Sequence, residues 1–313
     1  MTEATRKGDG AAGKPIRLAL VQMACGTDTN ANMEEADRRV RAAAADGARL
    51  VVLPELYRSP YFCQRQDPAA FDLAEPIPGP TTARLGAAAR ETGAWVIASV
   101  FERRARGLYH NTAALLAPDG TAALYRKTHI PHDPQFEEKY YFAPGDTGFR
   151  VFDLGPLRVG VLICWDQWFP EAARLCALAG ADLIVYPTAI GWLPEEQAAE
   201  GAAQHEAWRT VQRGHAIANG CYVAAVNRVG REPGPGADRA IDFWGGSFVC
   251  DPMGILLAEA GAAPETLVAD LDPGRIETVR RIWPFLRDRR PETYAGLLRM
   301  YGDGRDAGPA GRP

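Results

Sequence analysis

The chain has 313 residues, of which 47% are hydrophobic and 24% are charged, and these proportions are typical of a globular protein. The net charge of −4 gives no electrostatic reason to expect a nucleic acid as partner, and no apolar run is long enough to span a membrane. The N-terminal sequence MTEATRKGDGAAGKP lacks the apolar core of a secretory signal. We therefore expect a cytoplasmic protein with reduced thiols.

In the first half of the chain, apolar runs alternate with helical patterns and lead into a hairpin. We expect strands over 16–23, 49–53 and 94–101, helices over 30–45 and 81–92, and a hairpin of 110–117 and 121–125 around Pro118-Asp119-Gly120. The following segment, 126–148, is polar, aromatic and without periodicity. Long irregular loops in compact domains are usually functional, so we expect part of a site there.

The second half centres on a buried strand over 159–163 that ends on Cys164. A short turn follows, and Pro170 is well placed to start the next helix. We further expect a strand over 182–186, a long helix over 195–219 stopped by Gly220, a strand over 221–226, a hairpin of 243–250 and 255–259, a strand over 267–271, and a last helix capped by Asp272.

This order of strands, helices and a hairpin occurs twice, with no clear linker between the halves. It predicts one α/β domain over 15–301, built as a four-layer α-β-β-α sandwich of two facing sheets with helices outside. Residues 1–14 and 302–313 are predicted to be flexible tails.

The six cysteines form no CxxC pair, and the five histidines show no HxH or HExxH spacing. His205-Glu206 begins like a zinc motif, but Arg209 stands where the second histidine would be. We therefore expect neither a metal nor another cofactor. A metal-dependent enzyme with distant ligands that converge in the fold remains a third, weaker alternative.

Three apolar strands end on residues that suit catalysis: Glu55, Lys127 and Cys164. Each has an ordinary explanation when it is taken alone, since most intracellular cysteines are small buried hydrophobes and strand-end charges are often solvated. An apolar run that ends on a charged group is unusual, because burying that group is costly unless it is paired. Together the three residues suggest a nucleophile, a base and an oxyanion partner at the ends of strands.

With the sequence around them, these residues resemble the nitrilase superfamily of carbon–nitrogen hydrolases over most of the chain. The matching blocks are Leu53-Pro54-Glu55, Tyr125-Arg126-Lys127-Thr128-His129-Ile130-Pro131, Glu138-Lys139-Tyr140-Tyr141-Phe142, Pro144-Gly145-Asp146 and Ile163-Cys164-Trp165-Asp166. Within the superfamily, the segments ICWDQWFPEAARL, TAIGW, RGHAIANG, AAVNRVG and WPFLRDRRPE are similar to N-carbamoylputrescine amidases.

The resemblance implies a role for each residue. Cys164 would be the nucleophile, and Glu55 the general base that takes the thiol proton and later activates water. Lys127 would stabilise the developing oxyanion, aided by the backbone N–H of Trp165. Glu138 matches the second glutamate of the family and would orient Lys127 or assist proton transfer.

Two arginines that some relatives carry are missing from this chain, and their absence suggests the class of substrate. Relatives that act on N-carbamoyl amino acids carry two arginines shortly after the nucleophile, suited to a carboxylate, where this chain has Gln167-Trp168. An aromatic slot with acids nearby would instead suit an alkyl ammonium, although core packing explains one or two of the aromatic residues. The candidate side chains are Tyr57, Trp165, Trp168 and Trp192, with Asp133, Glu195 and Glu196 as acids, while Asp166 is expected to support the nucleophile turn.

The resemblance therefore implies a cysteine amidohydrolase that converts N-carbamoylputrescine to putrescine, ammonia and carbon dioxide in polyamine biosynthesis, through a covalent thioester-type intermediate. The alternatives are a β-ureidopropionase-like or ω-amidase-like hydrolase of another small amide, and a catalytically silent binding or scaffold member. The family likeness also implies a homo-oligomer, a dimer or larger.

Overall fold

Two six-stranded sheets form the centre of the molecule, and the computed structural model describes residues 15–234, 236 and 239–302. The predicted tails therefore lie outside the described residues, apart from Gly302. The first sheet has the order β15-β1-β2-β3-β4-β5. Its strands are β1 (Ile16–Gln22), β2 (Leu50–Val52), β3 (Trp95–Ala105), β4 (Leu108–Leu116), β5 (Ala122–Arg126) and β15 (Glu265–Leu271).

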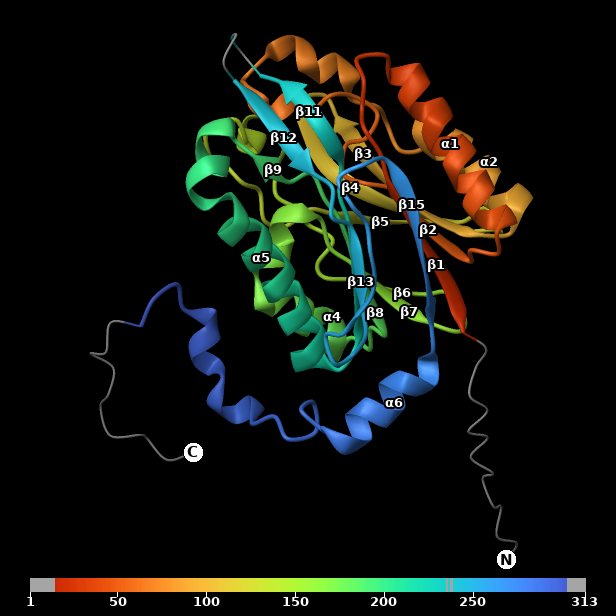
Figure 1. The fold of residues 1–313 in the computed structure, drawn as a ribbon, viewed down its shortest axis with the longest axis vertical. Coiled ribbons are helices and arrows are strands. Elements are labelled where there is room, and N and C mark those ends of the chain that lie inside the picture. The colour runs from red at the N-terminus through yellow and green to blue at the C-terminus, as the bar shows by residue number, and fades with distance from the viewer. Residues whose placement is uncertain (1–14, 235, 237–238, 303–313) are drawn as a thin grey trace, which may run out of the picture.

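The second large sheet has the order β14-β13-β10-β8-β7-β6, and a three-stranded sheet of order β11-β12-β9 lies at one end of the pair (Figure 1). The strands of the second sheet are β6 (Val151–Asp153), β7 (Arg158–Val161), β8 (Leu183–Pro187), β10 (Tyr222–Val226), β13 (Phe248–Cys250) and β14 (Leu256–Glu259). The small sheet consists of β9 (Gly191–Trp192), β11 (Val229–Pro233) and β12 (Ala240–Trp244).

Helices cover the outer faces of both large sheets. Figure 1 shows α1 (Thr29–Ala45) and α2 (Pro80–Thr92) on one side, and α4 (Pro170–Leu178) and α5 (Pro194–Asn219) on the other. A four-residue helix, α3 (Glu138–Tyr141), interrupts the long loop, and α6 (Pro273–Ile282) follows the last strand. The predicted α-β-β-α sandwich is confirmed. In the described part of the chain, every helix is too short or too polar to cross a membrane.

Strand β1 shows why the layers stack in this order. Its side chains alternate between two apolar clusters, so Leu18 and Leu20 face the second sheet while Ala19 and Val21 pack with the helices. A strand that is buried on both faces reads as a continuous apolar run. This is the pattern that made the central strands predictable.

The predicted hairpin strand over 243–250 is wrong in one respect. The structure divides it into the end of β12 and the whole of β13, because Gly245 and Gly246 have φ angles of 66° and 62°. Two successive left-handed residues end a strand, and only glycine adopts this conformation without strain. The chain thereby leaves the small sheet and enters the second large one.

Candidate active site

The ends of three strands from both large sheets meet at one place. Glu55 follows β2 and Lys127 follows β5 in the first sheet, and Cys164 follows β7 in the second. Glu55 donates its backbone N–H to Thr188 O at 3.4 Å, and the Cys164 thiol lies 3.8 Å from Ala189 O. The chain directly after β8 therefore contacts both the carboxylate-bearing segment and the thiol.

Lys127 lies between two carboxylates in a fully buried cluster. Its Nζ donates to Glu55 Oε1 at 2.8 Å and to Glu138 Oε2 at 2.7 Å. Glu138 Oε1 accepts a hydrogen bond from the Tyr61 hydroxyl at 2.7 Å. Glu55 Oε1 also accepts from Asn111 Nδ2 at 2.7 Å. Buried charges persist when they are paired and hydrogen-bonded in this way.

The pKa values follow from burial and from these pairs. Burial is the largest influence on Lys127 and favours the neutral amine, but Glu138 and Glu55 together raise the Lys127 pKa well above its usual value. Burial raises the pKa of Glu138 to about 7, although Lys127 opposes the rise. The cluster thus holds a permanent cation beside a carboxyl group that titrates near neutral pH.

Cys164 sits in a strained backbone conformation on a five-residue 3₁₀ turn, Cys164–Trp168. Its φ is 40°, a left-handed value that is uncommon for a residue with a Cβ and is found most often at functional sites. Burial, and then the Glu55 carboxylate, raise the pKa of its thiol well above the usual range, while Lys127 opposes them. The resting sulfur is therefore a thiol that needs a base.

Glu55 has an oxygen available for that proton. Its Oε2 atom is buried and has no hydrogen-bond partner among the described residues, whereas Oε1 holds Lys127 and Asn111. A buried carboxylate oxygen without a partner is costly and calls for an explanation. The explanation is that Glu55 Oε2 is kept free to accept the thiol proton.

Asp166 fixes the turn that carries the thiol, as its position suggested. Its Oδ2 accepts from the Ile163 backbone N–H at 3.0 Å and from the Tyr125 hydroxyl at 2.7 Å. Its Oδ1 accepts from the His129 backbone N–H at 3.0 Å and lies 2.7 Å from His129 Nδ1. The His129 ring stacks on Phe169 at 3.7 Å between centroids. The turn is therefore tied to the first sheet on one side and to the long loop on the other.

Gln167 and Trp168 stand where some relatives carry arginines, and their side chains lie in different surroundings. Gln167 is fully buried, and its Oε1 accepts from Trp208 Nε1 at 2.9 Å, so its amide is directed toward α5. Trp168 is partly buried and meets Trp165 edge-on at 6.4 Å between ring centroids.

The other predicted substrate-binding residues are spread over the molecule. Tyr57 is fully buried in the cluster between the first sheet and its helices, and its hydroxyl lies 3.9 Å from the Met33 sulfur. Trp192 donates to Gly201 O at 2.9 Å and packs on Trp244. Glu195 is exposed at the start of α5, and Asp133 is exposed on the long loop. The structure therefore does not bring Tyr57 to the Glu55–Lys127–Glu138 cluster.

Sequence reasoning missed Tyr61 and Asn111, which both hydrogen-bond to the cluster. Asn111 also accepts the backbone N–H of Lys127 at 2.9 Å, so one residue holds the lysine and the glutamate. A signal was available, because His110, Asn111 and Thr112 place three polar residues inside an otherwise apolar strand. Tyr61 gave no such signal in its proline-containing loop.

Arg228 and Glu232 hold the segment that links Glu55 to Tyr61. The Arg228 guanidinium is fully buried and donates to Leu56 O at 3.2 Å, to Ser59 O at 2.7 Å and to Glu232 at 2.5 Å. The second Glu232 oxygen accepts the Tyr61 backbone N–H at 2.6 Å. Leu56 needs this support, since its φ of 49° is also left-handed.

Glu138→Gln is expected to alter the pH dependence of stability. The folded pKa of about 7 exceeds the ordinary 4.5, so the folded protein binds this proton more tightly than the unfolded chain does. The resulting stabilisation is fully present below about pH 4.5 and is lost as the pH rises through about 7. Melting temperatures of wild type and variant across this pH range test the claim. The melting temperature of the variant should rise relative to that of wild type as the pH increases.

The control for this measurement is Glu34→Gln, at an exposed position on α1. The melting temperature of Glu34→Gln should change with pH in the same way as that of wild type. A constant difference between wild type and Glu138→Gln at every pH would show that Glu138 titrates at the same pH in both states.

Comparison with known proteins identifies the class. The family model described as carbon-nitrogen hydrolase matches residues 17–281. The chain belongs to this family and is an amidohydrolase. In the part of the chain that the structure describes, no group of three or more His, Cys, Asp or Glu side chains is arranged to hold a metal ion.

Individual relatives are similar over nearly their whole length. The N-carbamoylputrescine amidase of Solanum lycopersicum is 44% identical over 292 residues, which are 92% of this chain and 96% of the relative. The crystal structure of a carbon-nitrogen hydrolase from Helicobacter pylori G27 has a TM-score of 0.89 and 44% identity, covering 92% of this chain and 100% of the other. A variant of an amidase from Nesterenkonia sp. AN1 has a TM-score of 0.70 and 28% identity, covering 91% and 98%. That structure shows covalent addition of the acetamide moiety of fluoroacetamide at the active site cysteine.

Proposed function

We propose that this protein hydrolyses N-carbamoylputrescine to putrescine, ammonia and carbon dioxide, with Cys164 as nucleophile. The observation that carries the proposal is the buried Lys127, paired with Glu55 at 2.8 Å and Glu138 at 2.7 Å beside a thiol whose pKa is raised. The 44% identity to an N-carbamoylputrescine amidase supports the choice of substrate.

In the first half of the reaction, Glu55 Oε2 takes the thiol proton as the sulfur adds to the carbamoyl carbon. Lys127 and the backbone N–H of Trp165 stabilise the oxyanion that forms. The tetrahedral adduct then collapses, the proton passes from Glu55 to the departing nitrogen, and a carbamoyl thioester remains on Cys164. Glu138 and Tyr61 keep Lys127 in place, since both belong to the same hydrogen-bonded chain.

In the second half, Glu55 takes a proton from water as the water oxygen attacks the thioester carbon. The C–S bond breaks and the proton returns to sulfur. The carbamic acid that leaves loses carbon dioxide, which frees the second nitrogen. One water is consumed, and one putrescine, one ammonia and one carbon dioxide are formed, a reaction that would supply polyamine biosynthesis.

Hydrolysis of a matched substrate panel tests the proposal, with ammonia release as the readout. N-carbamoylputrescine should exceed N-carbamoyl-β-alanine in kcat/KM by about 100-fold or more, because a desolvated carboxylate without a partner loses several kcal/mol. An ω-amide of a dicarboxylic acid should also be a poor substrate. Equal turnover of the carboxylate compounds would reject the substrate assignment and leave the amidohydrolase class standing.

Assembly and location are further parts of the proposal. The segment after α6 exposes large apolar side chains, among them Trp283 (51% exposed), Leu298 (93%) and Tyr301 (82%). Apolar patches of this kind mark interaction surfaces, which supports a homo-oligomer. All six cysteines are free thiols, which supports a reducing compartment such as the cytoplasm.

A further inference from the structure

Asp166 closes the backbone around the nucleophile from both sides. Its Oδ2 accepts the Ile163 N–H at 3.0 Å, and its own N–H donates to Ile163 O at 3.0 Å. Cys164 lies inside this closed turn with its φ of 40°, and backbone strain of this kind persists only where the surroundings fix it. The orientation of the Asp166 carboxylate therefore sets the position of the backbone that carries the thiol.

The two oxygens of this fully buried carboxylate are held by different groups. Oδ2 also accepts from the Tyr125 hydroxyl at 2.7 Å. Oδ1 is held by His129, whose backbone N–H lies 3.0 Å away and whose ring Nδ1 lies 2.7 Å away. An ionised carboxylate can only accept hydrogen bonds, so Nδ1 carries the proton that joins the two side chains. The His129 ring is thereby fixed in one tautomer, with Nδ1 directed at Asp166.

Two aromatic rings hold the His129 imidazole in this orientation. It stacks on Phe169 at 3.7 Å between centroids with 5° between the planes, and it lies 6.2 Å from the Phe149 ring. Phe169 follows the nucleophile turn directly, and its N–H donates to Asp166 O at 3.2 Å. His129 therefore contacts both the carboxylate that closes the turn and the residue that follows it. Rotation of the imidazole away from Asp166 would break the stacking contact as well.

His129 lies two residues after Lys127, whose backbone is fixed on both sides. The Lys127 N–H donates to Asn111 O at 2.9 Å, and the Gly145 N–H donates to Lys127 O at 2.8 Å. Gly145 approaches this strand so closely that a Cβ on it would clash with Arg126 O. One short, fixed segment therefore carries both the cation of the proposed oxyanion site and the imidazole that holds the nucleophile turn.

The hydrogen bond between His129 and Asp166 also connects the two large sheets. Lys127 follows β5 of the first sheet, and Cys164 follows β7 of the second. Catalytic groups on different sheets keep their geometry only if the strand ends that carry them are joined. A misplacement of about 1 Å can cost about 100-fold in rate. His129 supplies such a joint directly beside the reacting groups, because it follows Lys127 along the chain and holds the turn of Cys164.

We propose that His129 is a positioning residue for the reaction, which acts through Asp166 to hold Cys164 in place relative to Lys127. This inference rests on the proposed function, because it takes Cys164 as the nucleophile and Lys127 as the oxyanion partner. The role requires no contact between His129 and the substrate. Loss of the imidazole should therefore lower kcat and kcat/KM together and leave KM nearly unchanged.

The test compares three replacements of His129 in the hydrolysis of N-carbamoylputrescine. His129→Leu removes the ring donor and should lower kcat about 10- to 100-fold. His129→Asn places an amide N–H close to the position of Nδ1 and should recover most of this loss. His129→Gln places its amide one bond further out and should recover less. A leucine variant as fast as wild type, or an asparagine variant no faster than the glutamine variant, would overturn the inference. The second comparison holds even if the leucine variant does not fold.

A double-mutant cycle tests whether His129 acts through Asp166. Asp166→Asn should itself lower kcat, because it weakens the closure of the nucleophile turn. Adding His129→Leu to this variant should cause little further loss, since the effects of two residues that act as one unit are not additive. Two losses that multiply fully in the double variant would show that His129 acts by another route and would reject the inference.

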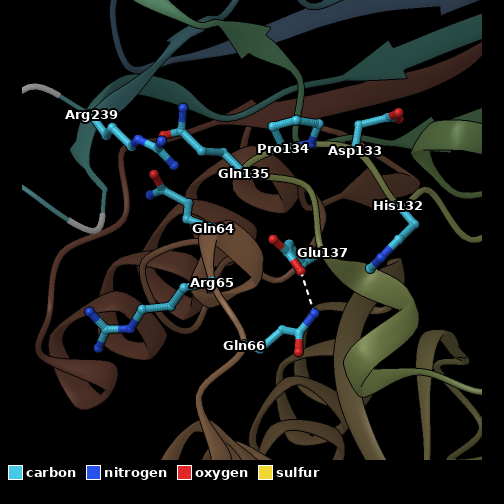
Figure 2. A pocket seen from close by; sticks show the side chains of 9 residues that line it. All are labelled: Gln64, Arg65, Gln66, His132, Asp133, Pro134, Gln135, Glu137 and Arg239. Carbon is cyan, nitrogen blue, oxygen red and sulfur yellow. Dashed lines mark hydrogen bonds between the residues drawn. The ribbon is translucent and has the colours of Figure 1, made fainter.

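The control is His132→Leu, three residues further along the same loop. His132 is exposed, and Figure 2 shows it in the wall of a cavity of about 530 Å³ whose lining residues include neither Lys127 nor Cys164. This variant should leave both kcat and KM unchanged. A loss as large as that of His129→Leu would mean that any change in this loop slows the reaction, and would overturn the specific role of His129.

Alkylation of Cys164 keeps this test independent of the proposed substrate. Should wild type release no ammonia from N-carbamoylputrescine, the proposed function fails, while the rate at which iodoacetamide modifies Cys164 still reports the placement of its thiol. Peptide mass spectrometry follows this rate, and melting temperatures show that each variant is folded. The rate should fall in His129→Leu, recover in His129→Asn and stay at the wild-type value in His132→Leu. An unchanged rate in a folded His129→Leu variant would reject the positioning role.

Discussion

Cys164→Ala is expected to abolish turnover of N-carbamoylputrescine while the fold is retained. The thiol is the nucleophile in the proposed reaction, and no other group at this turn can form the thioester. Alanine removes only one buried sulfur, so the loss of stability should be small beside the loss of rate. Ammonia release and the melting temperature measure the two effects separately.

The matched control is Cys176→Ala, another buried cysteine, on α4. It should retain activity. An alkylating reagent should also modify Cys164 before the other five thiols, because Glu55 can take its proton, and peptide mass spectrometry identifies the site. Appreciable turnover by Cys164→Ala would remove the covalent mechanism.

Glu55→Gln and Lys127→Met are each expected to lower kcat by about 100-fold or more, the usual effect of removing a positioned base or an oxyanion partner. Lys127→Met also leaves two buried carboxylates without their cation, so its melting temperature should fall as well. Rates must therefore be corrected for the folded fraction. Lys139→Met, at an exposed position on α3, is the control and should behave like wild type.

The same preparations test whether a metal takes part. Prolonged dialysis against a chelator should leave the wild-type rate unchanged, because the proposed steps use only the side chains of Glu55, Lys127 and Cys164 and the backbone N–H of Trp165. Loss of activity that zinc restores would contradict the proposed mechanism, whatever the result for the variants.

Sequence reasoning located Glu55, Lys127 and Cys164 because each ends an apolar strand. A strand that is buried on both faces is visible as a continuous apolar run, and a charge at its end stands out against that run. The side chains that hold these residues could not be found in the same way. Arg228 contacts Leu56 across 172 positions of sequence, and no local pattern reports a contact of that separation.

The division of residues 240–250 between two sheets was missed for a related reason. Both halves are apolar and extended, so periodicity alone joins them into one strand. The paired glycines Gly245-Gly246 were the available signal, since adjacent left-handed residues end a strand. The placement of the candidate acids was equally hidden, because composition alone does not tell that Asp133 and Glu195 are exposed.

The order of the first sheet has a consequence for synthesis of the chain. Strand β1 pairs with β15 along its whole length, from Ile16 with Leu271 to Gln22 with Glu265. On the ribosome, β1 must wait for about 250 further residues, roughly 10 to 50 seconds at typical elongation rates, before that partner emerges. During this interval one apolar edge strand is open to other nascent chains. Protection of that edge by a chaperone that binds extended apolar segments would then govern how much enzyme a cell obtains from each message.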